Sequence, residues 1–103
     1  MDPEVCNSCG ECAAVCPVVV PDEFQMGLSS RRAIYLPFPQ SVPLIYSIDP
    51  EHCLYLTKGV CGACEKLCEA GAIDYEQKEE MLNLEVGSVI LAAGFKAFDP
   101  SRF

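Results

Sequence analysis

The sequence predicts a small α+β domain made of two similar halves that are joined by an extended, proline-rich segment. Its 103 residues are enough for one domain. Its eight cysteines fall into two groups of four with related spacing. Between these groups, residues 17–48 hold no cysteine, and their prolines at 21, 37, 39 and 43 prevent a long helix. A repeated unit of this kind is typical of a pseudo-symmetric domain with two half-sites.

The repeat is visible in the residues around the cysteines. Asp-Pro-Glu stands shortly before the first cysteine of each group, and each group ends in Cys-Gly-x-Cys-x-x-x-Cys. The second group differs by a five-residue insertion between its first and second cysteines. The first group comprises Cys6, Cys9, Cys12 and Cys16, and the second comprises Cys53, Cys61, Cys64 and Cys68.

The local patterns predict short elements. Each Cys-Gly-x-Cys run is expected to begin a short helix. Residues 32–36 and 44–48 are expected to be extended, and residues 21–26 to form one helical turn that begins at Pro21 and ends at Gly27. Residues 72–75 are predicted to form a strand that pairs with residues 46–48. Residues 82–86 alternate like a strand, and the apolar run at 89–94 predicts a strand buried on both faces.

Composition excludes several classes of function. With 7 basic and 15 acidic residues, the net charge is −8, which argues against binding nucleic acid or an anionic membrane surface. No apolar run is long enough for a membrane helix, and the first residues have no signal-peptide pattern, so a cytoplasmic location is expected. Without an export signal, eight cysteines favour a metal site over a disulfide framework.

The cysteine spacing identifies the metal site. The first group reads C-x2-C-x2-C-x3-C followed by proline, the pattern of two-cluster bacterial ferredoxins. Three closely spaced thiolates wrap one cubane, and the fourth, one helical turn further on, points to the other cubane. Two [4Fe-4S] clusters are therefore predicted. Cluster I would be held by Cys6, Cys9, Cys12 and Cys68, and cluster II by Cys53, Cys61, Cys64 and Cys16.

Two other interpretations of the cysteines compete with this one. Structural zinc also uses four cysteines, but it usually takes two pairs per ion. Disulfides within each group are disfavoured by the tight spacing. The second group also departs from the ideal pattern. The predicted loop 54–60 leaves Cys53 as the ligand most open to replacement, and His52 is a conceivable substitute, although a surface histidine is the expected interpretation. Glu69 stands in the place of proline; a carboxylate close to a cluster would disfavour adding an electron, but Glu69 is expected to be a solvated residue.

Other side chains are expected to pack around the clusters or to face solvent. The predicted apolar shell is Val15, Val18, Ile34, Ile48, Leu67 and Ile73. Four aromatic residues are expected to pack around the clusters or to line an electron path: Tyr35, Phe38, Tyr46 and Tyr55. The pair Arg31-Arg32 has two interpretations, a solvated pair or a docking point for an acidic partner.

The chain resembles the ferredoxin domain found in the A-type subunits of heterodisulfide reductases. The resemblance lies in residues 6–17, 20–24, 32–43, 53–61, 71–74 and 86–94. It implies that residues 1–80 are a ferredoxin-like domain with two [4Fe-4S] clusters, inserted in a larger flavoprotein. Residues 81–103 would return the chain to an FAD domain that lies outside this sequence, with Ala92-Ala93-Gly94 ending the return strand where the family has Ala-Thr-Gly. FAD binding is not expected here, because the dinucleotide-binding glycine motif is missing.

The implied function is electron transfer. The clusters would pass single electrons between the FAD of the parent protein and partner redox subunits, namely other reductase, hydrogenase or dehydrogenase subunits. The alternative is a metal-stabilised structural or interaction domain without redox turnover. An enzyme in its own right would need an unliganded iron or a second cofactor site, and the sequence shows neither.

Overall fold

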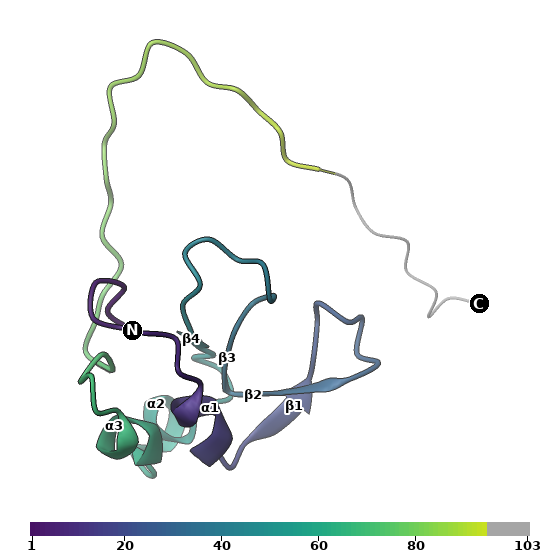
Figure 1. The fold of residues 1–103 in the computed structure, drawn as a ribbon, viewed down its shortest axis with the longest axis vertical. Coiled ribbons are helices and arrows are strands. Elements are labelled where there is room, and N and C mark those ends of the chain that lie inside the picture. Colours follow the sequence, from purple (N-terminus) through teal and green to yellow (C-terminus); the bar gives the residue numbers. More distant parts are fainter. Residues whose placement is uncertain (95–103) are drawn as a thin grey trace.

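The described part of the chain, residues 1–94, folds around three short helices and two small sheets. A computed structural model describes residues 1–94. Each sheet has two antiparallel strands, and the helices lie beside them (Figure 1). The residues that follow this body, coloured green to yellow, lead away from it as a long segment without helix or strand (Figure 1). No helix in the described part of the chain has the length and apolar character needed to cross a bilayer.

Helices α1 and α3 begin where the sequence predicts them. Helix α1 spans Glu11–Val15 and α3 spans Ala63–Leu67. Each follows a glycine in the left-handed conformation, Gly10 with φ 86° and Gly62 with φ 77°. An L side chain rarely adopts this conformation. The two helices pack against each other, which brings the two cysteine groups side by side.

The insertion between Cys53 and Cys61 is a helix, not the loop predicted from its length. Helix α2 spans Leu54–Lys58. These five residues contain neither glycine nor proline, and Gly59 ends the helix with φ 68°. Its N–H donates to the carbonyl oxygen of Tyr55 at 2.9 Å, the closing bond typical of a glycine C-terminus.

The central segment forms both sheets. Strand β1 (Val19–Pro21) pairs with β2 (Ser30–Arg32), and β3 (Ile34–Tyr35) pairs with β4 (Ser47–Ile48). The expected extended segments 32–36 and 44–48 therefore contain short strands. The predicted pairing of residues 72–75 with 46–48 is wrong, because β4 pairs with β3 instead. Residues 72–75 form no strand, and the Ala72 carbonyl oxygen accepts the N–H of Asp2 at 2.7 Å.

The expected helical turn at residues 21–26 is the tip of the β1–β2 hairpin. Pro21 belongs to β1 rather than to the turn. The turn starts later, where the N–H of Met26 donates to the Glu23 carbonyl oxygen at 3.1 Å. The N–H of Gly27 donates to the Asp22 carbonyl oxygen at 2.8 Å. The hairpin geometry thus overrides the local helical preference.

The strands predicted at residues 82–86 and 89–94 are not formed in this structure. Val89, Ile90 and Leu91 are 81%, 91% and 88% exposed, whereas the sequence predicted burial on both faces. A strand needs a neighbour for its backbone hydrogen bonds, and no pairing partner for this segment exists among residues 1–94. The phenylalanines of the expected return segment at 95, 98 and 103 lie outside the described residues.

The apolar core is small. Cys12, Ile34 and Ile73 form its buried centre, and Val20, Ala33 and Ala72 are also buried. Of the six predicted shell residues, Ile34 and Ile73 are buried. Val18 and Ile48 are half-buried, and Val15 and Leu67 are exposed. One thiol, that of Cys12, belongs to the buried centre, and Cys16, Cys64 and Cys68 pack against it.

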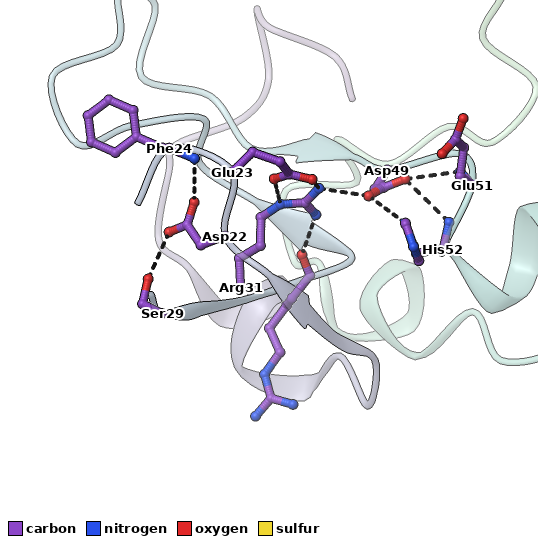
Figure 2. A network of polar contacts seen from close by, with 9 residues as sticks. Asp22, Glu23, Phe24, Ser29, Arg31, Asp49, Glu51 and His52 are labelled. Carbon is purple, nitrogen blue, oxygen red and sulfur yellow. Dashed lines mark hydrogen bonds and ion pairs between the residues drawn. The ribbon is translucent and has the colours of Figure 1, made fainter. Parts of the chain in front are cut away.

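Arg31 is held in a charge network rather than in solvent or at a docking surface (Figure 2). Its side chain is 8% exposed and lies between two carboxylates. Nε and Nη2 donate to the two carboxylate oxygens of Glu23 at 2.6 Å, and Nη2 also donates to Asp49 Oδ2 at 2.8 Å. The guanidinium lies over the ring of Tyr35, 3.8 Å from its centroid. Both sequence-based interpretations of Arg31 are wrong, because the buried Asp49 supplies a partner that local sequence does not reveal.

Asp49 connects this network to the turn that ends in Cys53. Its Oδ1 accepts the N–H groups of Glu51 and His52 at 3.0 and 3.3 Å, and its carbonyl oxygen accepts the N–H of Cys53 at 3.0 Å. Burial raises the pKa of Asp49. The hydrogen bonds from Arg31 and His52 outweigh that effect and hold the pKa below its usual value. The carboxylate thus stays charged and fixes the turn.

Removing the buried carboxylate should destabilise the fold more than removing the exposed one. Asp49→Ala leaves Arg31 buried beside Glu23 alone and should lower the free energy of unfolding by about 3 kcal/mol. Glu23 is 70% exposed, so Glu23→Ala should have a much smaller effect because water screens its charge. Urea unfolding followed by circular dichroism measures both variants. Equal losses would contradict the role given to Asp49.

Gly10 should tolerate a side chain less well than Gly71. Both have positive φ, so alanine at either position carries about 1–2 kcal/mol of backbone strain. A Cβ at Gly10 would also lie 2.9 Å from the Tyr46 hydroxyl oxygen, whereas Gly71 faces open space. Gly10→Ala should therefore lower the urea midpoint more than Gly71→Ala. Adding Tyr46→Phe should recover part of that difference, and no recovery would mean that the hydroxyl contact is unimportant.

Candidate metal centre

The eight cysteines line two cavities, four in each. The first cavity is lined by Cys6, Cys9 and Cys12 from the first group and by Cys68 from the second. The second cavity reverses this composition. It is lined by Cys53, Cys61 and Cys64 from the second group and by Cys16 from the first. The structure thus brings together the same two sets of four that the spacing rule predicts.

The crossing of the fourth cysteine follows from the packing of α1 and α3. Cys16 directly follows α1, and Cys68 directly follows α3. Both have extended backbone there, with φ near −70°, so the chain leaves each helix at this residue. Because the helices pack against each other, the end of each helix reaches the cavity formed by the other group.

The two cavities differ in polarity. The second encloses about 350 Å³, part of it open to solvent, and its lining contains no charged side chain among the described residues. The first encloses about 930 Å³, likewise partly open, and is lined by Glu11 and Glu69 besides its thiols. Glu69, the residue in the place of proline, therefore does lie beside a thiol set.

His52 does not replace Cys53 in the second cavity. Cys53 lines the cavity, whereas the His52 ring turns to Asp49, with 3.0 Å between Nδ1 and Oδ2. Of the expected aromatic residues, Tyr46 lines the first cavity and Tyr55 the second. Tyr35 and Phe38 line neither cavity, because Tyr35 lies under Arg31 and Phe38 stacks on Phe24.

The surroundings of two thiols, those of Cys12 and Cys64, favour neutral sulfur unless a cation is bound. Burial raises the pKa of Cys12 to about 11; the Ala13 N–H lowers it in part, and the nearby thiols of Cys64, Cys9 and Cys6 raise it further. Burial also raises the pKa of Cys64. Metal binding requires thiolates. Bound metal would supply the positive charge that offsets the burial and mutual repulsion of these sulfurs.

The four thiols of each set lie around a cavity and do not converge on one point. In residues 1–94, no three histidine, cysteine, aspartate or glutamate side chains converge closely enough to bind one metal ion. Each set of four thiols instead lines a cavity.

Tyr75 is a contact of this site that sequence reasoning missed. Its hydroxyl oxygen lies 2.9 Å from Sγ of Cys64, and it lines the second cavity. In the sequence it was only the last residue of a predicted strand, and no spacing relation linked it to a cysteine. A backbone donor reaches the other set, where the N–H of Ala72 lies 3.4 Å from Sγ of Cys68.

Known proteins support the metal assignment. The family model described as "4Fe-4S binding domain" matches residues 1–22. The chain is 52% identical over 99 residues to the A-type iron–sulfur subunit of the CoB–CoM heterodisulfide reductase of Methanocaldococcus jannaschii. It is 50% identical over 97 residues to the A-type subunit of the ferredoxin:CoB–CoM heterodisulfide reductase of Methanosarcina acetivorans. These alignments cover 96% and 94% of this chain.

A third relative gives the same result. The A-type subunit of the H2/formate:CoB–CoM heterodisulfide, ferredoxin reductase of Methanococcus maripaludis is 50% identical over 102 residues, or 99% of this chain. The chain spans only 14%, 12% and 15% of the length of these three relatives. With this similarity along nearly all of its length, the chain belongs to the family of heterodisulfide reductase A-type subunits, of which it represents a ferredoxin-type, iron–sulfur-binding part.

Proposed function

We propose that this chain holds two [4Fe-4S] clusters and relays single electrons within a heterodisulfide reductase-type flavoprotein. The observation that carries this proposal is the composition of the two cavities, each with three thiols from one cysteine group and one from the other. Cluster I would be held by Cys6, Cys9, Cys12 and Cys68. Cluster II would be held by Cys16, Cys53, Cys61 and Cys64.

When bound, each cluster supplies a centre that accepts and releases one electron. Four thiolates for four irons leave no iron position open, so the thiols serve to hold the metal and not to bind a substrate. The packing of α1 against α3 keeps the two thiol sets adjacent. Ile34 and Ile48 line the second cavity and give part of its wall an apolar surface. An apolar lining and hydrogen bonds to the sulfurs are among the factors that determine the reduction potential of a cluster.

We further propose that residues 1–80 form the electron-transfer domain and residues 81–103 return the chain to the FAD domain of the parent protein. The exposed apolar side chains of residues 81–94 support this division, because they have no partner within residues 1–94. The exposed large residues there are Met81, Leu82, Leu84, Val86, Val89, Ile90 and Leu91. Electrons would pass between that FAD and partner reductase, hydrogenase or dehydrogenase subunits.

Reconstitution should load two reducible clusters. After anaerobic incubation with iron and sulfide, the chain should bind about eight irons and eight inorganic sulfides, as two cubanes require. Dithionite should then bleach the visible absorbance and produce a paramagnetic resonance signal. Eight irons that never accept an electron would favour the purely structural role. Stoichiometric zinc without sulfide would contradict the cluster assignment.

Pairs of cysteine substitutions should reveal which thiols share a cluster. The double variant Cys6→Ala/Cys68→Ala removes two ligands of cluster I and leaves cluster II intact. About four irons should therefore remain, as one cubane requires. In Cys6→Ala/Cys16→Ala the changes strike both clusters, and little iron should remain. A local assignment, with Cys16 on the same cluster as Cys6, predicts the opposite order.

A second pair of variants is the control for unfolding. Cys16→Ala/Cys53→Ala should retain about four irons, again one cubane, whereas Cys53→Ala/Cys68→Ala should lose both clusters. Iron and sulfide analysis together with circular dichroism measures all four variants. If iron content follows the sequence groups rather than the cavities, the assignment of Cys16 and Cys68 is wrong.

A further inference from the structure

The side chain of Tyr75 is held in place against Cys64 by its neighbours. Ala72 and Ile73, just before it, are 1% and 6% exposed, so the segment is anchored in the core. The Tyr75 ring stacks on the ring of Tyr55, with 4.0 Å between centroids and 20° between planes. This stacking leaves the hydroxyl oxygen 2.9 Å from Sγ of Cys64.

The inserted helix α2 supplies the stacking partner. Tyr55 lies in α2, within the insertion that distinguishes the second cysteine group from the first. Its ring passes over Gly62, where a Cβ would lie 3.6 Å from Cδ2 of Tyr55. Gly62 directly precedes α3, the helix that contains Cys64. The inserted helix α2, Gly62 and the stacked pair of Tyr55 and Tyr75 therefore lie together near Sγ of Cys64.

The direction of the hydrogen bond follows from the chemistry of a metal-bound cysteine. A thiolate has no proton to give, so the hydroxyl is the donor when Cys64 binds metal. The ordinary pKa of a tyrosine hydroxyl is about 10, well above neutral pH. The hydroxyl therefore keeps its proton and remains a donor.

The first cavity has a tyrosine without this contact. Tyr46 lines that cavity, but its hydroxyl points at Gly10, whose Cβ position is 2.9 Å away. Among residues 1–94, Tyr75 is the only side chain hydrogen-bonded to a cysteine sulfur. Within the described part of the chain, the thiols of the second cavity therefore have a hydrogen bond from a side chain, that of Tyr75, which the thiols of the first cavity lack.

We infer that Tyr75 is a positioning and tuning residue whose hydroxyl donates to Sγ of Cys64 and raises the reduction potential of the cluster in the second cavity. The inference rests on the proposed function. Reduction adds one electron from an external one-electron donor; no bond breaks, and the proton stays on the tyrosine oxygen. Since the added charge spreads to the sulfurs, the hydrogen bond stabilises the reduced state more than the oxidised state.

Tyr75→Phe in the iron-loaded chain tests this inference. A redox titration followed by paramagnetic resonance should show one of the two midpoint potentials falling, with the reduction equilibrium weakened about threefold to tenfold. Tenfold corresponds to about 59 mV for one electron. Tyr35→Phe is the matched control, because Tyr35 lines neither cavity, and it should leave both potentials unchanged. Unchanged potentials in Tyr75→Phe, with both clusters present, would overturn the inference.

A second measurement separates tuning from packing. Replacing all tyrosines with 3-fluorotyrosine makes the hydroxyl a stronger donor and should raise the same potential that Tyr75→Phe lowers. In the Tyr75→Phe background, fluorotyrosine should have no effect. If Tyr75→Phe instead loses the iron of one cluster and fluorotyrosine shifts nothing, the tyrosine serves only packing and the inference fails. A wild-type chain without two reducible clusters would instead refute the proposed function.

Discussion

The packing of α1 against α3 is the contact on which the rest of the site depends. Each helix ends at a cysteine, and the contact between the helices carries that cysteine to the cavity of the opposite group. The apolar core is too small to hold the halves together alone, with Val20, Ile34 and Ile73 as its large buried aliphatic side chains. A group bound by thiols from both halves would join them, as metals do in other small domains.

A second link joins the central segment to the cysteines. Arg31 lies on β2, yet its buried partner Asp49 begins the turn that leads into Cys53. The proline-rich segment between the cysteine groups is therefore more than a spacer. Its hairpin supplies the positive charge that allows a carboxylate to be buried at the entrance to the second thiol set.

The sequence predicts the features that depend on the spacing of cysteines and glycines. It does not predict the contacts between residues that are far apart in the chain. The two sets of four thiols and the helices after Gly10 and Gly62 follow from local patterns. Helix α2 was not predicted, because the residues inserted between Cys53 and Cys61 were interpreted as a loop. The burial of Arg31 and the placement of Tyr75 depend on partners 18 and 11 residues away. The strand at residues 72–75 failed because β4 has its partner in β3.

The short helix between Cys53 and Cys61 also affects how such proteins are found. A search by fixed cysteine spacing recognises the first group, which reads C-x2-C-x2-C-x3-C, and passes over the second, where seven residues separate Cys53 from Cys61. Counts of cluster sites made from such motifs would record one thiol set in this chain, although the fold has two. The two cysteine groups thus differ in spacing, although each lines a cavity together with the last cysteine of the other group.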